Sequence, residues 1–306
     1  MNTNDVIARR AVFSGLVMTT LLIFPLIINF GCKSSYPRDT IVKSVKDMAK
    51  KDYNLDVDVI LAGETLGIQF RIKNIMGEMV AEDQLLWKQM ENLMMVLSRV
   101  VLSSDKSPQF IVLDIVDEDN PRLHFVLTRY VEDLHKVMSE GLSRTHFLDR
   151  LLMELVIGEK RLVFDPMDMD MVRLLMLAVD VPSEDNSKEV TFPLTDIDMR
   201  DFMSKVTSNI VRRLFREEKM MVKTYSLRDV TASFRSSLDK GKEYQILLDL
   251  VSLPEAQRKY PSLEQKIFPT ILKEAAYLFK SYKFDQFQAI TVMDRNSGRS
   301  LTTLKN

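Results

Sequence analysis

The chain has 306 residues and is nearly neutral, with 42 Lys and Arg against 43 Asp and Glu. Its 46% hydrophobic and 28% charged residues are ordinary for a globular protein and exclude general disorder. Binding to nucleic acid through phosphates requires a basic excess, so we expect no nucleic-acid partner. One Cys and three His leave little material for disulfides or a zinc site, and we expect no metal or cofactor.

The first 31 residues differ from all that follow. Arg9 and Arg10 precede 21 residues without a charge, 11–31, which is close to the length of a membrane-spanning helix. Positive charge followed by an apolar stretch at the start of a chain is typical of a secretory signal or an N-terminal membrane anchor. The sequence therefore predicts export from the cytoplasm.

The apolar run ends at Gly31, which is followed by Cys32, the only cysteine. This order of basic start, apolar stretch, small residue and Cys resembles the signal peptide of bacterial lipoproteins, although that family usually has Leu and a small residue where this chain has Asn29 and Phe30. The resemblance implies cleavage after Gly31 and acylation of Cys32, whose lipid would anchor the protein to a membrane. The remainder of the chain also looks similar to uncharacterised envelope lipoproteins of uncultured bacteria.

These observations predict a signal peptide over 1–31 and a lipidated Cys with its linker over 32–38. An uncleaved single-pass anchor is the alternative. We expect a periplasmic body in the cell envelope, and Lys33 directly after Cys32 slightly favours the outer membrane. The body has no further thiol that could pair wrongly in an oxidising compartment, which agrees with this location.

The first half of the body predicts two β-hairpins with amphipathic helices. Apolar residues recur every three or four positions over 83–103, and this pattern indicates a helix with one buried face. Runs of β-branched and aromatic residues separated by polar turns indicate strands. The predicted strands are 57–62, 66–72, 110–116 and 122–130, and the other predicted helices are 39–52, 131–139 and 144–156.

The second half repeats the order hairpin, helix, hairpin. Asp117 and Asp294 each end a predicted strand, and Arg122 and Arg299 each open the next. We therefore predict an α+β fold of two subdomains, 39–181 and 190–306, with an internal duplication as an open alternative. The predicted strands here are 229–236, 243–251, 287–293 and 299–304, the helices are 167–178, 196–216 and 262–282, and a hairpin surrounds Gly158.

Few residues suggest catalysis or metal binding. Asp165, Asp168 and Asp170 precede an apolar helical pattern, so we interpret them as helix-capping residues and not as a calcium loop. His124, His135 and His146 lack the spacing of metal ligands, and the alternation of the strand predicts that His124 faces away from its apolar neighbours. No phosphate-binding loop or nucleophile motif occurs, and no catalytic, metal or cofactor residue is assigned.

We therefore expect a membrane-tethered envelope lipoprotein that acts by binding, as a binding or assembly module for an envelope protein or lipid. The alternative is a hydrolase of an envelope polymer. A cleft in which two carboxylates, or a His and an acid, converge would favour the enzyme. An apolar groove or a free sheet edge would favour binding.

Overall fold

The computed structural model describes residues 36–80, 85–143, 146–147, 150–158, 160–164, 196–217, 225–237, 241–252 and 263–304. The predicted signal peptide with Gly31, and Cys32, lie outside these ranges, as do the acidic motif 165–170, the predicted helix 167–178 and the predicted boundary loop 182–189. No helix within the described ranges is long and apolar enough to cross a membrane.

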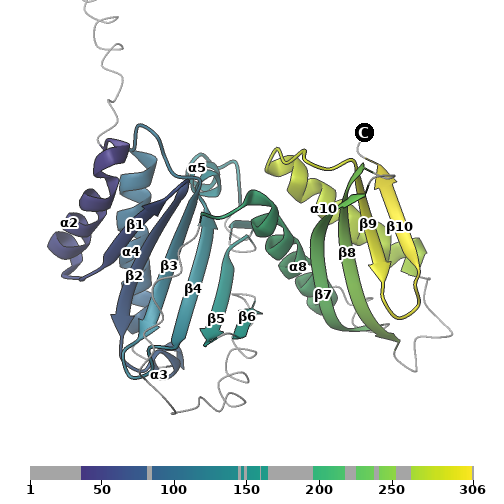
Figure 1. Ribbon diagram of the computed structural model, residues 1–306, viewed down its shortest axis with the longest axis horizontal. Helices are drawn as coiled ribbons and strands as arrows, with labels where there is room; N and C mark the ends of the chain where they lie inside the picture. The colour runs from purple at the N-terminus through teal and green to yellow at the C-terminus, as the bar shows by residue number, and fades with distance from the viewer. Residues whose placement is uncertain are drawn as a thin grey trace, which may run out of the picture.

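The first subdomain is a six-stranded sheet in the order β1-β2-β3-β4-β5-β6, covered on one face by helices (Figure 1). Strands β2 and β3 are parallel and all other neighbours are antiparallel. The strands are β1 (Asp58–Ala62), β2 (Thr65–Ile72), β3 (Phe110–Asp117), β4 (Leu123–Tyr130), β5 (Leu152–Ile157) and β6 (Lys160–Phe164). The helices are η1 (Arg38–Thr40), α2 (Ile41–Tyr53), α3 (Ile75–Val80), α4 (Leu85–Leu102) and α5 (Val131–Met138).

Helices α2 and α4 bury the face that their apolar spacing predicts. Ile41, Val45 and Ala49 follow one side of α2, and the buried side chains of α4 repeat every three or four residues. They pack on the side chains of the central strands that point to the same face, among them Ile68 and Leu113. This core fixes one face of the sheet and leaves the other face for contacts with the second subdomain.

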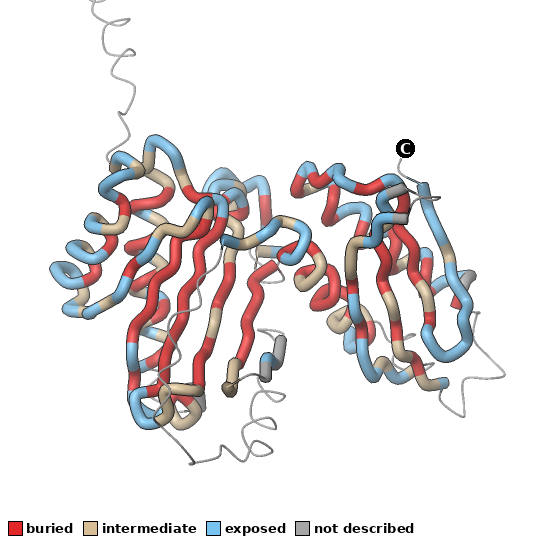
Figure 2. The backbone as a smooth tube through the Cα atoms, in the orientation of Figure 1, coloured by how far each residue is buried: buried red, intermediate tan, exposed pale blue. Residues whose placement is uncertain are grey.

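The second subdomain is a four-stranded sheet in the order β10-β9-β8-β7. Its strands β8 and β9 are parallel and the outer pairs are antiparallel. Figure 2 shows its central strands buried and β10 exposed. The strands are β7 (Tyr225–Ser237), β8 (Gly241–Ser252), β9 (Ala289–Asp294) and β10 (Ser300–Leu304), and the helices are α8 (Met199–Glu217), η3 (Leu263–Ile267, a π-helical turn) and α10 (Phe268–Ser281).

Both subdomains share one arrangement: a helix, an antiparallel hairpin, a second helix, and a closing hairpin whose first strand runs parallel to the last strand of the first hairpin. Asp117 pairs with Ile72 and Asp294 pairs with Leu248, so the two acids occupy equivalent positions. Each carboxylate accepts backbone N–H groups of the turn that follows it. The shared topology and the equivalent acids are what an internal duplication requires.

The α+β fold with two sheet-containing subdomains is confirmed, and the prediction of a helix over 144–156 is wrong from residue 152 onward. Residues 152–157 form β5, because this apolar run pairs with β4 and, through a hairpin at Gly158, with β6. Gly158 has a positive φ of 59°, as its predicted turn requires. Pro269 lies in the first turn of α10, where its missing N–H costs no helical hydrogen bond.

The segment that leads into α8 is fixed on the β1–β2 turn of the first subdomain. The Asp196 carboxylate accepts the backbone N–H of Glu64 and the hydroxyl of Thr65, both at 3.0 Å. The Thr65 hydroxyl oxygen in turn accepts the backbone N–H of Ile197 at 2.9 Å. Because Thr65 is fully buried, this contact holds the start of α8 at a defined place beside the first sheet.

We predict that Gly63→Ala loosens this attachment. A Cβ at Gly63 would lie 2.1 Å from Asp196 Oδ2, and the φ of 54° adds backbone strain. Urea unfolding should show a loss of about 1–3 kcal/mol. Gly298→Ala is the matched control, because Gly298 also has a positive φ of 70° but nothing lies within 4 Å of the added Cβ. Equal losses in the two variants would contradict the role of the Asp196 contact.

Candidate ligand-binding cleft

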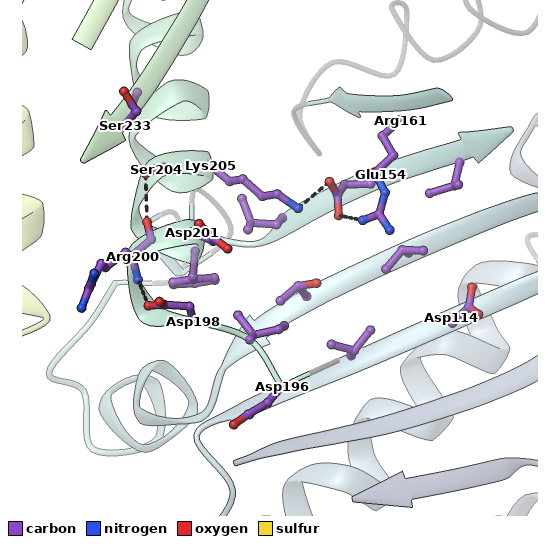
Figure 3. A pocket seen from close by; sticks show the side chains of 18 of the residues that line it. Asp114, Glu154, Arg161, Asp196, Asp198, Arg200, Asp201, Ser204, Lys205 and Ser233 are labelled. Carbon is purple, nitrogen blue, oxygen red and sulfur yellow. Dashed lines mark hydrogen bonds and ion pairs between the residues drawn. The ribbon is translucent and has the colours of Figure 1, made fainter. Parts of the chain in front are cut away.

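A cleft of about 710 Å³ lies between the two subdomains. One wall is the helix-free face of β3, β4, β5 and β6, and the other consists of the start of α8 and three residues of β7 (Figure 3). This volume is within the range of natural ligand sites. The lining is mixed, with Val112, Val126 and Val156 from the strands and Phe202 and Phe234 from the second subdomain among its apolar residues.

The strand wall carries polar residues at every second position, because strand side chains alternate between the two faces. Asp114, His124 and Glu154 all point to the cleft, whereas Leu113 and Phe125 belong to the core under the helices. We call this helix-free side the polar face. The strand position predicts the orientation of His124 correctly, away from Leu123 and Phe125.

Asp114 and His124 form a buried hydrogen-bonded pair on the polar face. The Asp114 carboxylate lies 2.9 Å from Nδ1 of His124 and accepts the Gln69 side-chain amide at 2.8 Å. Nε2 of the same ring lies 3.1 Å from the carbonyl oxygen of Pro121. Both ring nitrogens are therefore within hydrogen-bond distance of oxygen atoms. With each nitrogen engaged, His124 has no position left from which to take a proton from a nucleophile.

Glu154 is also fully engaged. Lys205 of α8 donates to its Oε1 at 2.8 Å, and Arg161 of β6 lies 3.9 Å from its Oε2 (Figure 3). Glu154 is only 4% exposed, so the two cations compensate a carboxylate that water does not reach. The Lys205 contact joins α8 to the first sheet across the cleft.

The start of α8 gives the cleft an acidic end. Asp196, Asp198 and Asp201 line it, and all three are exposed. Asp198 accepts the backbone N–H of Arg200 at 2.8 Å and so caps the helix. Arg200 donates to Gln286 of the second subdomain at 2.9 Å. Carboxylates thus outnumber cations at this end, whereas Lys205 and Arg161 outnumber Glu154 at the other.

Beside the cleft, aromatic rings connect the subdomains. Phe202 of α8 contacts Phe110 and Tyr130 of the first sheet, with centroids 5.1 and 6.1 Å apart, and Tyr282 at 5.9 Å. Phe110 belongs to the same core cluster as Phe202 although it comes from β3. Such ring contacts stabilise beyond their burial. They set the width of the cleft, because α8 cannot move from the first sheet without separating them.

A buried polar group reinforces this joint. Asp133 of α5 accepts the hydroxyl of Tyr282 and lies 3.0 Å from Nη1 of Arg150. Burial, with the charge of Asp133, raises the pKa of Tyr282 well above its ordinary value of about 10. Burial also lowers the pKa of the neighbouring Arg129 to about 10, against the opposing effect of Asp133. At neutral pH the phenol is therefore neutral and donates to a charged carboxylate.

The structure places His135 and His146 beside different neighbours. Asp133, a neighbour of His135, is held by Arg150 and Tyr282, and the ring of His146 lies 6.2 Å from that of Tyr277. Within the described ranges no three His, Cys, Asp or Glu residues form a group that could hold a metal ion. Cys32, Gly31 and the acids 165, 168 and 170 lie outside the described residues.

Sequence reasoning did not find the cleft itself. Its residues come from strands and a helix far apart in the chain, and their neighbourhood depends on the pairing of β3, β4 and β5. One signal was present in the sequence: Asp114 and Glu154 interrupt otherwise apolar runs. A charged residue inside a buried strand needs a partner and so indicates a polar cluster.

No protein-family model, curated protein or solved structure matches this chain.

We predict that His124→Ala destabilises the first subdomain. The change leaves the buried Asp114 carboxylate without its hydrogen-bonded histidine, and removing one partner of a buried hydrogen bond costs about 1–3 kcal/mol. Denaturant unfolding measures the loss. His146→Ala, at an exposed histidine, is the control and should change the free energy of unfolding by less than about 0.5 kcal/mol. A loss for His124→Ala no larger than that of the control would contradict the role of the Asp114–His124 hydrogen bond.

We predict that Tyr282→Phe lowers stability at pH 7 by about 1–3 kcal/mol, because Asp133 loses a donor. The folded-state pKa of Tyr282 is raised, so its stabilisation is complete below pH 10 and is lost as the pH rises above the unfolded-state pKa. The free energy of unfolding between pH 9 and 11 should therefore decline less steeply in the variant. Tyr277→Phe, at an exposed tyrosine, is the control. An unchanged alkaline slope in Tyr282→Phe would contradict this assignment.

Proposed function

We propose that this chain is a membrane-tethered envelope lipoprotein whose cleft binds a ligand without chemical conversion. The observation that carries the binding role is the state of the polar groups in the cleft. Asp114, His124 and Glu154 are each hydrogen-bonded to other groups of the protein. Groups held in this way shape and polarise a site, but they are not poised for acid–base or nucleophilic work.

The alternative of an envelope-polymer hydrolase receives no support from the same geometry. The cleft does bring a His and an acid together, but Nε2 of His124 is turned to the Pro121 carbonyl. The hydroxyl of Ser204, another lining residue, donates to the Arg200 carbonyl one turn earlier in α8. A triad needs a nucleophile bonded to the free nitrogen of the ring, and the contacts of Ser204 and of the His124 ring do not provide this arrangement.

The tether supports the envelope location. The loop after α4 holds the backbone of Tyr36 through two hydrogen bonds. The N–H of Tyr36 donates to the Ser103 carbonyl, and the Tyr36 carbonyl accepts the N–H of Asp105. Only three residues, 33–35, separate Cys32 from Tyr36. Four chain steps span at most about 14 Å. A lipid on Cys32 would therefore hold the end of the molecule where the chain enters in Figure 1 close to a membrane surface.

Arg38 strengthens this attachment. Its guanidinium donates to the carbonyl oxygens of Lys106 and Gly63, and its backbone N–H donates to Asp105. Gly63 belongs to the β1–β2 turn that also binds Asp196 at the start of α8. The tether, the first sheet and the wall of the cleft are thus connected through one turn. In this proposal the cleft is presented to envelope proteins or lipids at a fixed distance from the membrane.

We predict that Cys32→Ser releases the chain from the membrane. With the wild-type chain expressed in a Gram-negative host, mass spectrometry should find an acylated Cys32 as the first residue and the chain in the membrane fraction. The variant should lack the lipid. Gly298→Ala, a change on the exposed β9–β10 turn, serves as the control and should leave fractionation unaltered.

Three outcomes are distinguishable. Retention of residues 1–31 on a membrane-bound chain would support the uncleaved anchor and contradict acylation. A freely soluble chain that still begins with Met1 would overturn the envelope location. Loss of membrane binding in Cys32→Ser, with an acylated wild-type chain, is the result that the proposal requires.

A further inference from the structure

The outer edge of β7, which pairs with no further described strand, forms part of the cleft wall. Sheet order places β7 at the end of its sheet, paired with β8 alone among the described strands. Ala232, Ser233 and Phe234 of β7 line the cleft. An edge strand presents backbone donors and acceptors that another extended chain can pair with.

The contacts of Arg212 show which backbone groups face this edge. Val230 is buried toward α8, whereas Asp229 lies on the opposite face, where Arg295 reaches it. Arg212 starts from α8 yet lies 3.8 Å from Asp229 and donates to the Val230 carbonyl at 3.4 Å. To reach both, the side chain must pass around the outer edge of β7. The Val230 carbonyl therefore points away from β8.

The same orientation extends into the cleft. In an antiparallel ladder, alternate residues direct both their N–H and their C=O to the same side. The register from Asp229 to Ser237 is regular, so Ala232 and Phe234 share the outward orientation of Val230. Among the described residues, no hydrogen bond is found to the backbone of Ala232 or Phe234 beyond the β8 ladder. The backbone N–H and C=O groups of Ala232 and Phe234 thus face the cleft.

The opposite wall offers places for the side chains of such a strand. Val126 and Val156 provide an apolar floor on the polar face, and Phe234 adds a ring from β7. A bound strand would direct alternate side chains toward this floor and the others toward solvent. An alternating apolar and polar segment fits this arrangement, whereas an acyl chain would leave the β7 backbone groups without partners.

The charges of the cleft determine which charges a peptide antiparallel to β7 would need at its two ends. Phe234 pairs with Tyr244, whose hydroxyl donates to the Met203 carbonyl near the start of α8, the end at which Asp198 and Asp201 lie. Val230 lies by Arg212, farther along α8 and beyond Lys205. A peptide antiparallel to β7 therefore begins at the acidic end and finishes toward Lys205 and Arg161. A basic residue at its start and an acidic residue at its end complement these charges.

We propose that the cleft binds an extended peptide segment of another protein as an added antiparallel strand on β7, with alternating apolar residues, a basic start and an acidic end. This inference rests on the proposed binding function and names its ligand class. It does not depend on the lipid at Cys32, so the two can fail separately.

Calorimetric titration of the full chain in detergent tests the proposal. The probe is the capped peptide Lys-Val-Thr-Val-Thr-Glu, and the matched peptides are its charge-reversed form, Glu-Val-Thr-Val-Thr-Lys, and a form N-methylated at the amides that would face β7. The probe should bind at least about tenfold more tightly than either matched peptide. Equal binding of the N-methylated form would overturn strand addition, and equal binding of the reversed form would overturn the assigned direction.

Two variants test the edge from the side of the protein. Ala232→Pro removes an outward N–H inside the cleft and should weaken probe binding at least about tenfold, because Pro is tolerated at a free edge but cannot donate. Ser236→Pro removes the outward N–H of an exposed residue four positions farther along β7, outside the cleft lining, and should leave binding unchanged. Circular dichroism checks that both variants are folded. Should Ala232→Pro not fold, the binding of the N-methylated peptide to the wild-type chain still tests strand addition.

The lipid alternative is a defined outcome of the same experiment. Suppose that a fluorescent fatty acid binds the chain, that substitutions in the cleft weaken this binding, and that no peptide binds. This result would overturn the peptide proposal. It would leave the proposed binding function in place with a lipid ligand. Absence of both ligands from the cleft would contradict the peptide proposal and the binding function together.

Discussion

The packing of α8 against both sheets is the contact on which the rest of the structure depends. Phe202 projects from α8 into a ring cluster with Phe110 of the first sheet and Tyr282 of the second subdomain. Lys205, one turn later, reaches Glu154 across the cleft. Without this shared helix the two subdomains would be separate units and the polar face would have no opposite wall. The cleft thus exists because α8 packs against both subdomains.

The polar face shows how a sheet can carry charges at low exposure. Asp114 and Glu154, each taken as a whole residue, are 2% and 3% exposed. Each carboxylate has a cation or an amide donor within hydrogen-bond distance. Unpaired, either carboxylate would cost several kcal/mol. Because the partners come from β4, β6 and α8, the cluster also specifies the register of the strands and the position of the helix. The charges of Asp114 and Glu154 serve the architecture, whereas the outward backbone groups of Ala232 and Phe234 on the β7 edge make no hydrogen bond to another described residue.

Much of the fold could be predicted from the sequence, and the parts that could not have physical reasons. The period of α4 and the polar turns after Asp117 and Asp294 determine helices and hairpins locally, and the structure places them within a few residues of the predictions. The run from Leu152 to Ile157 is short and uniformly apolar, so its spacing suits a helix as well as a strand; its pairing with β4 decides for the strand. The parallel pairs β2–β3 and β8–β9 each join strands that a helix separates in the chain. Such pairing leaves no local pattern in the sequence. The cleft depends on these pairings, so it could not be predicted, although the charged residues in its strands signalled a polar cluster.

Amide hydrogen exchange along β7 of the full chain tests the account most directly. In the free chain, the amides of Ala232 and Phe234 should exchange rapidly, whereas those of Thr231 and Ser233, which face β8, should be protected. On addition of the alternating peptide, Ala232 and Phe234 should become protected. Protection of these two amides already in the free chain, or no change with a peptide that binds, would contradict a cleft built around an open strand edge.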